Sequence, residues 1–332
     1  MSIFGKSRED YEDEEMELEE RAPSAKKFKD LKPENKRKRK EPQKPWGKPE
    51  RFTILTVLLL TILTSLFLSL SARNFKLPGL PRISLPSFNW GESTIVIEGN
   101  KESRQKSEKG KDFFNDKVRR LSGVYALYLV RLSDLSSYGV NEDEEMQAAS
   151  LIKLPIMTLV YKKSEEGKLD LDEVTEGSKS TYRELVEAMG QRSDNSAQIT
   201  LVKIFGNEEI QNYIESIGMT KTSLEENTTT PYEIGGFFQM LWGNELVTEK
   251  SRDEILEFMT DTIFEDWLVK GIDEVRVAHK YGREVHVVND AGIVFAGRPF
   301  VLVLMSDGAV ESEADTVLSE IAKGIYEIEI GN

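Results

Sequence analysis

The sequence predicts a mixed α/β (α+β) fold in which an antiparallel sheet is flanked by N- and C-terminal helices, with an all-α subdomain beside it. Three strand-like runs follow one another late in the chain: residues 275–281, 285–295 and 300–305. A longer region, 150–270, has apolar residues at the three-to-four spacing of amphipathic helices. An amphipathic helix over 311–328 closes the chain. Strands combined with a helical insert and a last helix indicate a sheet with helices packed on it.

Residues that favour strands also lie before the helical region. Residues 123–132 are rich in Val, Leu and Tyr and predict a strand, and 136–139 indicate a turn or a short second strand. A short amphipathic helix is expected near Asp112. We therefore place the folded domain at residues 110–332.

Residues 1–51 consist largely of charged side chains, first acidic and then basic. Such blocks bury too little apolar surface to offset chain entropy, so we expect a disordered tail. The basic run 36–40 would also suit nucleic acid, but its position just before an apolar segment has a simpler explanation. We expect no nucleic-acid partner.

The apolar segment, residues 52–70, contains no charged side chain. A helix of about 20 residues crosses the hydrocarbon core of a bilayer. The segment lies too far into the chain for a cleaved signal peptide, so residues 52–72 are expected to form an uncleaved transmembrane signal anchor. Lys and Arg crowd its N-terminal flank. This predicts a single-pass protein of the cell membrane, with residues 1–51 cytoplasmic and the folded domain extracellular or periplasmic.

Residues 73–109 contain closely spaced prolines and then a charged stretch, which predicts an extended stalk. The chain has no cysteine, which excludes disulfides, thiol nucleophiles and Cys-ligated metals. Its formal net charge of −14 favours solubility over any particular partner. The two histidines, His279 and His286, lack the spacing of a metal site, so we expect structural roles and no metal.

Ser150 and Lys153 form the first of three short motifs that could carry chemistry. A serine hydroxyl needs a nearby base to act as a nucleophile. Residues i and i+3 share a helix face, so Lys153 can reach Ser150. Lysine acts as a base only where its pKa is lowered, and the surrounding residues are apolar or small. By itself the pair is more simply explained as a helix N-cap followed by a solvated lysine.

The second motif, Ser193-Asp194-Asn195, lies in a predicted turn between two helices. In a functional interpretation the Ser193 hydroxyl lies between the lysine and a leaving group, and the Asn195 amide holds the substrate. Ser, Asp and Asn are also the preferred N-cap residues, so helix capping alone would explain the motif.

The third motif, Lys280-Tyr281-Gly282, lies where a predicted strand ends. A lysine there can pair with a substrate carboxylate, and a glycine lets substrate backbone approach closely. An edge lysine followed by a turn glycine is the simpler alternative for this motif alone. The order of the three motifs along the chain is what makes them specific.

In this order the motifs resemble those of class A β-lactamases and penicillin-binding proteins. The similarity covers roughly residues 110–330. Residues 148–155 look like the family's nucleophile helix, and residues 181–197 look like its second helix and loop. Residues 228–231 look like its threonine-proline element after the omega loop, and residues 277–280 and 289–294 look like its two facing strands. The resemblance implies the β-lactamase-like fold and a serine hydrolase that needs no cofactor.

The resemblance also implies catalytic roles. Ser150 would be the acylated nucleophile, Lys153 its base and Ser193 the proton relay. The family's oxyanion hole consists of backbone N–H groups, which correspond to Ser150 and Arg283. Loss of one such donor typically costs about 10²–10³ in rate.

Substrate binding would fall to Asn195, which positions an amide, and to Lys280, Tyr281 and Gly282, with Lys280 binding a carboxylate. Tyr281 departs from the family, which normally has Thr or Ser there. Its phenol can still donate a hydrogen bond, but its ring needs room. Arg283 and Arg276 could supply extra carboxylate binding, although surface arginines are an adequate explanation for both.

The second departure concerns deacylation. The family's omega loop carries a glutamate in a Glu-x-x-Leu-Asn stretch, and none occurs between Asn195 and Thr228. Glu225 and Glu226 are the nearby substitutes, and a solvated pair of loop residues is the simpler explanation of them. Without a carboxylate that positions water, acylation could proceed while hydrolysis stalls.

Two functions fit the sequence. The first is a membrane-anchored serine hydrolase that forms an acyl-enzyme on Ser150 with β-lactams or D-alanyl peptides, as a β-lactamase or a D,D-peptidase. The second is a penicillin-binding sensor or scaffold domain that does not turn over. The small-molecule partner expected in either case is a β-lactam or a peptidoglycan-type peptide.

Overall fold

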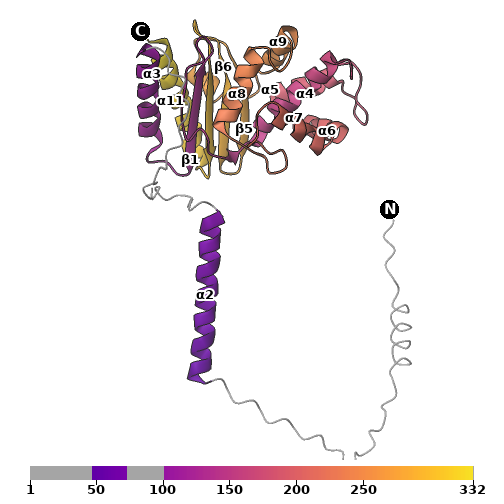
Figure 1. Ribbon diagram of the computed structural model, residues 1–332. Helices are drawn as coiled ribbons and strands as arrows, with labels where there is room; N and C mark the ends of the chain where they lie inside the picture. Colours follow the sequence, from indigo (N-terminus) through magenta and orange to yellow (C-terminus); the bar gives the residue numbers. More distant parts are fainter. Residues whose placement is uncertain (1–46, 73–100, 332) are drawn as a thin grey trace, which may run out of the picture. The chain divides into compact units, whose positions relative to one another are not determined.

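The computed structural model describes residues 47–72 and 101–331 (Figure 1). The first of these stretches is a single helix, α2 (Lys48–Ala72). The side chains of its residues 52–65 are exposed. Across both described stretches, no helix combines the length and the apolar character needed to cross a membrane. The predicted span over 52–72 stays a prediction. Of the tail expected at 1–51, residues 48–51 belong to α2 and are helical, while residues 1–46 lie outside the described residues, as does the part of the expected stalk at 73–100.

The predicted antiparallel sheet is present and has five strands. They are β1 (Val124–Arg131), β2 (Ser137–Val140), β5 (Val277–Glu284), β6 (Val287–Val294) and β7 (Phe300–Asp307). Their spatial order is β2-β1-β7-β6-β5, and each pairs antiparallel with its neighbours. The first and last strands of the domain therefore lie side by side, with Val124 opposite Asp307 and Arg131 opposite Phe300.

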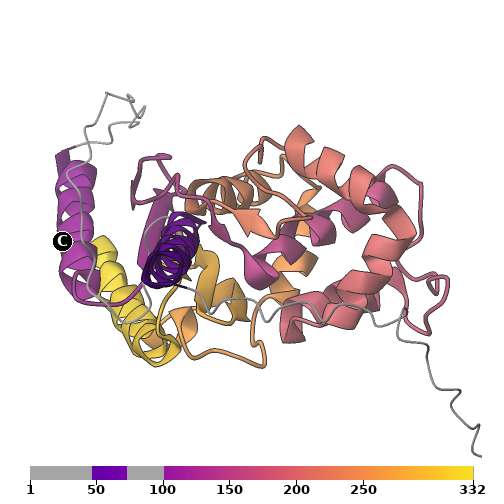
Figure 2. The same ribbon diagram turned by 90° about the horizontal axis from the view of Figure 1, so that it is seen from below.

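Helices cover both faces of this sheet. Helices α3 (Lys101–Val118) and α11 (Glu311–Ile330) pack on one face, and α8 (Pro231–Trp242) packs on the other (Figures 1 and 2). Strand β1 is buried on both sides, because Tyr125 belongs to the core under α11 while its neighbour Ala126 belongs to the core under α8. Because side chains alternate between the two faces of a strand and both faces of β1 are buried, the sequence of β1 is an almost continuous run of apolar residues.

The domain begins earlier than the sequence indicated. Helix α3 starts at Lys101, so residues 101–109 are helical instead of being part of the expected stalk. Lys106 donates a hydrogen bond to the Glu329 carbonyl at 2.9 Å, and Gly110 packs against the ring of Tyr138. The narrow contact face of α3 leaves most of its charged residues in solvent, which is why this stretch resembled a linker.

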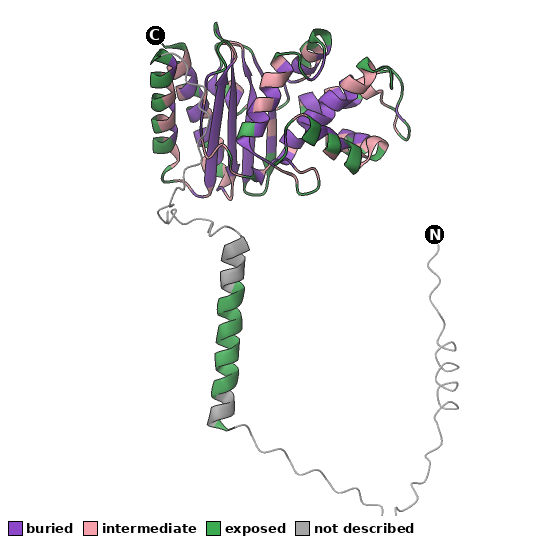
Figure 3. Cartoon of the chain, viewed as in Figure 1, coloured by how far each residue is buried: buried purple, intermediate pink, exposed green. Residues whose placement is uncertain are grey.

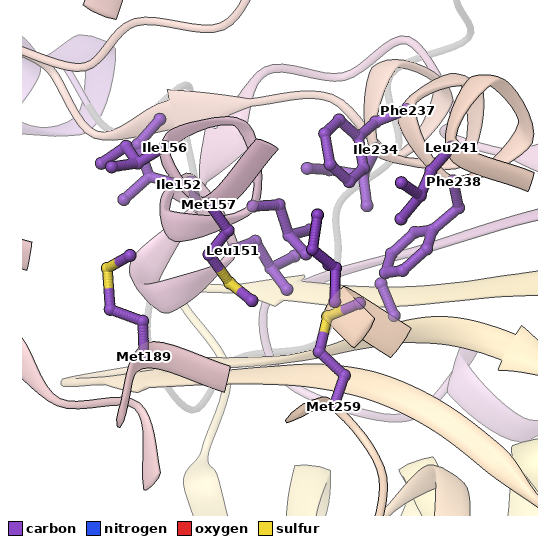
Figure 4. Packing of buried hydrophobic residues seen from close by; sticks show 14 of the residues in the cluster. Leu151, Ile152, Ile156, Met157, Met189, Ile234, Phe237, Phe238, Leu241 and Met259 are labelled. Atoms are coloured by element: carbon purple, nitrogen blue, oxygen red, sulfur yellow. The ribbon is translucent and has the colours of Figure 1, made fainter. Parts of the chain in front are cut away.

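The all-α subdomain lies beside the sheet and consists of α4 (Lys153–Glu165), α5 (Tyr182–Arg192), α6 (Asn195–Phe205), α7 (Asn207–Ser216) and α9 (Glu249–Phe258). Its core continues under α8, where residues of the first turns of α4 meet α8 and Met259 (Figure 4). Figure 3 shows α4 as almost wholly buried, while α6 and α7 have exposed outer faces. The segment that carries Ser150 and Lys153 is therefore anchored in the centre of the domain.

Short elements complete the fold: β3 (Met146–Gln147), β4 (Thr228–Thr229), the 3₁₀ turn η2 (Ala149–Ile152) and α10 (Leu268–Gly271). One expectation needs adjustment: strand β5 continues to Glu284, so the third motif lies within the strand instead of at its end. In β6, Gly292 permits the close pairing with β5, because a Cβ there would collide with the Ala278 carbonyl.

Candidate active site

Ser150 lies in η2, and η2 leads directly into α4, whose first residue is Lys153. The Lys153 ammonium donates a hydrogen bond to Ser150 Oγ at 2.7 Å. Leu151 and Ile152 are buried and hold the turn in the core. Ala149 has a φ of +48°, which is costly for a residue with a Cβ and is found where the surroundings force it. The backbone therefore presents Ser150, which is partly exposed, at a fixed position above a buried lysine.

The second motif joins α5 to α6. Ser193 ends α5 with a φ of +55°, and the carboxylate of Asp194 caps α6 by accepting from Ser196 N at 2.7 Å and Ala197 N at 3.0 Å. Capping thus explains Asp194. The residues on either side of Asp194, Ser193 and Asn195, face Lys153. The Lys153 ammonium donates to the Ser193 carbonyl at 2.9 Å and to Asn195 Oδ1 at 2.6 Å.

The third motif brings a second lysine to the same point. The Lys280 ammonium donates to Ser193 Oγ at 2.9 Å and to the Tyr281 carbonyl at 2.9 Å. The same Ser193 hydroxyl lies 3.3 Å from Lys153 Nζ. The structure thus brings Ser150, Lys153, Ser193 and Lys280 together, with the Ser193 hydroxyl between two ammonium groups.

Burial shifts the pKa values of both lysines. Lys153 is 1% exposed, and desolvation lowers its pKa to about 8, against the smaller raising effects of the Asp194 and Glu284 charges. Lys280 is fully buried, and desolvation together with the charge of Lys153 lowers its pKa well below the ordinary lysine value, while Asp290 acts in the opposite direction. A lysine with a lowered pKa has a larger neutral fraction near pH 7, which is what a proton acceptor needs.

Gly282 allows β5 to contact η2, the turn that carries Ser150. A Cβ at this position would lie 2.8 Å from Ser150 N and 3.2 Å from the Ala148 carbonyl. The close approach that this glycine permits is therefore with η2, whereas the sequence suggested an approach by substrate backbone.

Ser150 N lies beside Gly282, the residue that precedes Arg283 on β5. His279 N donates to the Met259 carbonyl at 2.8 Å, which lies outside the sheet. N–H directions alternate along a strand, so Arg283 N, four residues later, points to the same open edge of β5. The Arg283 guanidinium turns away and pairs with Asp315 at 2.7 and 3.0 Å.

Asn289 of β6 holds the segment before Ser150, a role that the sequence did not reveal. Its side-chain amide donates to the carbonyls of Gln147 at 2.8 Å and Ala148 at 3.2 Å, and its Oδ1 accepts from Ser306 N at 3.0 Å. A fully buried amide with all of these partners ties the chain before Ser150 to the sheet. A polar residue within an apolar strand was the signal available in the sequence.

The next residue, Asp290, forms a second buried network. Its carboxylate lies 2.7 Å from His279 Nδ1 and accepts from Leu268 N at 2.9 Å. His279 Nε2 lies 3.2 Å from Thr262 Oγ1. These contacts fix the loop between α9 and β5 against the sheet. This is a structural role for His279, as expected.

Glu225 and Glu226 are exposed on the loop before β4. Among the described residues, neither carboxylate hydrogen bonds to Ser150 or Lys153. The loop is fixed elsewhere: Glu233 accepts from Lys221 N at 2.7 Å and from Thr222 Oγ1 at 2.6 Å. The loop also contacts the segment before Ser150, because Ala148 N donates to the Asn227 carbonyl at 2.7 Å.

Comparison with known proteins gives a consistent result. The model of the β-lactamase enzyme family (Beta-lactamase2) matches residues 111–328. An ancestral class A β-lactamase (GNCA) superposes with a TM-score of 0.61 at 22% identity, covering 67% of this chain and 99% of that one. The structure of PBP-A gives 0.60 at 23% identity, covering 69% and 95%. A β-lactamase from Xanthomonas campestris gives 0.59 at 19%, covering 68% and 97%. No curated protein sequence matches the chain.

Replacing Gly282 by alanine should slow the reaction of Ser150 with a serine-directed fluorophosphonate by about 10²-fold, since the new Cβ must displace Ser150 N. Labelling rates measured by intact mass report the change. Gly297→Ala is the matched control, because a Cβ there meets nothing within 4 Å. An unchanged rate in folded Gly282→Ala protein would show that the contact between β5 and η2 does not matter for reactivity.

Proposed function

Since the chain belongs to the β-lactamase enzyme family, we propose that it is a serine hydrolase that forms an acyl-enzyme on Ser150. The observation that carries this proposal is the hydrogen bond between Lys153 and Ser150, at 2.7 Å, next to a Ser193 hydroxyl shared with Lys280. A nucleophile, a base of lowered pKa and a route for the proton are thus adjacent.

In the proposed acylation, neutral Lys153 takes the proton of Ser150 Oγ as that oxygen attacks the substrate carbonyl carbon. The N–H groups of Ser150 and Arg283 stabilise the negative charge that develops on the carbonyl oxygen. The carbonyl–nitrogen bond then breaks, and the leaving nitrogen receives a proton through the Ser193 hydroxyl. That hydroxyl is replenished by the ammonium of Lys153, so the proton count balances.

The acyl donors proposed are β-lactams or D-alanyl peptides. Hydrolysis of the acyl-enzyme also needs a group that activates water. The loop carboxylates of Glu225 and Glu226 make no contact with Ser150, which favours slow deacylation. A D,D-peptidase or a penicillin-binding sensor with a long-lived adduct is therefore the alternative to a rapid β-lactamase.

A fluorescent penicillin should label the full-length protein on Ser150 and leave only slowly, because neither Glu225 nor Glu226 hydrogen bonds to Ser150 or Lys153. Gel fluorescence followed over hours, beside a Ser150→Ala control, measures both steps. Label that disappears within seconds would contradict slow deacylation. Equal labelling of the control would contradict the assignment of Ser150.

The acylation rate should rise with pH and level off above about 8, the pKa of Lys153, because only the neutral amine accepts the proton. Below that value the rate should fall about tenfold per pH unit. Stopped-flow acylation between pH 6 and 9.5 measures the profile. Asp194→Asn keeps a helix cap but removes a charge that raises this pKa, so its midpoint should move to lower pH. A flat profile would exclude Lys153 as the base.

We also propose that residues 52–72 anchor the enzyme in the cell membrane, with residues 1–51 cytoplasmic and the enzyme domain outside. The uncharged apolar run and its basic flank support this. The full chain should sediment with membranes, resist extraction by high salt and dissolve in detergent. A variant that lacks residues 1–72 should stay in the supernatant. Full-length protein found in the soluble fraction would contradict the anchor.

A further inference from the structure

We propose that Glu284 of β5 is the general base that activates water for hydrolysis of the acyl group on Ser150. This inference rests on the proposed acyl transfer at Ser150 and adds the residue that completes the reaction. Hydrolysis of an ester is helped by a group that takes a proton from the attacking water. Among the described residues, no hydrogen bond joins Glu225 or Glu226 to Ser150 or Lys153, so a carboxylate from another element is needed.

The first argument is the face of β5 on which Glu284 lies. Side chains on one face of a strand recur at every second residue, so Lys280, Gly282 and Glu284 share a face. On that face Lys280 donates to Ser193 Oγ at 2.9 Å, and a Cβ at Gly282 would lie 2.8 Å from Ser150 N. Glu284 follows Gly282 after about 7 Å of strand. Its side chain therefore leaves β5 on the side of the reactive serine.

The second argument is that Asn227 holds the Glu284 carboxylate beside the segment before Ser150. Asn227 Nδ2 donates to Glu284 Oε1 at 3.0 Å, and the Asn227 carbonyl accepts from Ala148 N at 2.7 Å. One residue thus links the carboxylate to the chain two positions before the nucleophile. Within the described part of the chain, Asn227 is the hydrogen-bond donor to this carboxylate, and Glu284 is exposed. Glu284 Oε2 is therefore open to a water molecule.

The third argument is that Asn227 keeps this position at a cost. Its φ is +52°, in the left-handed region. Its Oδ1 is buried and has no hydrogen-bond partner among the described residues. Both features are unfavourable, and they are concentrated at functional sites, where the surroundings hold a residue in one conformation. The amide is thus aimed at Glu284 although its own oxygen gains nothing.

The fourth argument is electrostatic. Desolvation lowers the pKa of Lys153 to about 8, and among the described residues the carboxylates that raise it are those of Asp194 and Glu284. Asp194 is occupied, because it caps α6 and pairs with Arg192 at 3.4 Å. Glu284 is therefore the carboxylate near Lys153 that has an oxygen available for water.

In the proposed step, Glu284 takes a proton from a water molecule as the water oxygen bonds to the acyl carbon. The bond between that carbon and Ser150 Oγ then breaks. The proton returns to Oγ by way of Lys153, whose Nζ lies 2.7 Å from it. The products are a carboxylic acid and free Ser150, and the enzyme regains its starting protonation. A base that is exposed to solvent, as Glu284 is, gives slow hydrolysis.

The test separates acylation from hydrolysis. Full-length wild-type protein, Glu284→Gln, Glu284→Ala and the double variant Glu225→Gln/Glu226→Gln are labelled with a fluorescent penicillin, beside Ser150→Ala as background. Labelling is done at pH 9.5, where Lys153 is neutral with or without the Glu284 charge. Excess penicillin is removed, and loss of the label at pH 7 is followed over several days by gel fluorescence and intact mass. Circular dichroism confirms that each variant is folded.

We expect every variant except Ser150→Ala to be labelled as the wild type is. Glu284→Gln keeps an oxygen that accepts from Asn227 but loses the base, so its label should leave about 10²-fold more slowly. The double variant should lose its label at the wild-type rate. Glu284→Ala should be as slow as Glu284→Gln, and added formate should restore hydrolysis in proportion to its concentration, because a small carboxylate can enter the vacated space.

Four outcomes would overturn the inference while leaving acylation of Ser150 intact. They are a wild-type label that never leaves, an unchanged rate of loss in Glu284→Gln, a comparable slowing in the double variant, and a slow Glu284→Ala that formate does not accelerate. The last would give Glu284 a positioning role instead of a role as base. If the wild-type protein is labelled no more than Ser150→Ala, the proposed function is wrong, and the inference is overturned with it.

Discussion

The burial of two lysine ammonium groups beside each other is the constraint on which the rest of this domain depends. A charge removed from water must be surrounded by hydrogen-bond acceptors, and two like charges raise that requirement further. The acceptors for Lys153 and Lys280 come from η2, from the turn between α5 and α6, and from β5. Three distant segments of chain must therefore meet at one point, and the sheet and subdomain are arranged so that they do.

Neighbouring hydrogen bonds hold the strained backbone around the two lysines in place. Ala149 and Ser193 both have positive φ values. Ala149 precedes Ser150, whose Oγ accepts from Lys153, and the carbonyl of Ser193 itself accepts from Lys153. Asn289 fixes the carbonyls before Ala149, and Asp194 caps the helix that follows Ser193. Strain of this kind persists only where neighbouring interactions over-determine the conformation. The buried amide and the helix cap thus hold the backbone on either side of the two buried lysines.

The sequence was sufficient for the sheet and the helical subdomain, because apolar periodicity follows directly from burial. It was sufficient for the three motifs because their order along the chain resembles that of a known family. It was insufficient where partners lie far apart along the chain. Asn289 contacts residues 147 and 148 across the domain, and nothing local to β6 indicates this. Tyr281 looked like a simple substitution, yet its environment depends on Phe264 in a separate loop. The start of α3 was missed because a helix with a narrow contact face has the composition of a linker.

The pairing of β1 with β7 has a consequence for biogenesis. These strands lie at the centre of the sheet, yet they are separated by the whole helical subdomain in the sequence. The sheet cannot close until residue 307 has been made, so the contacts that complete the core join residues far apart in the sequence. Folds dominated by such contacts form slowly. Strand β1 leaves the ribosome long before β7 and would remain without this central partner until synthesis of the domain is nearly complete.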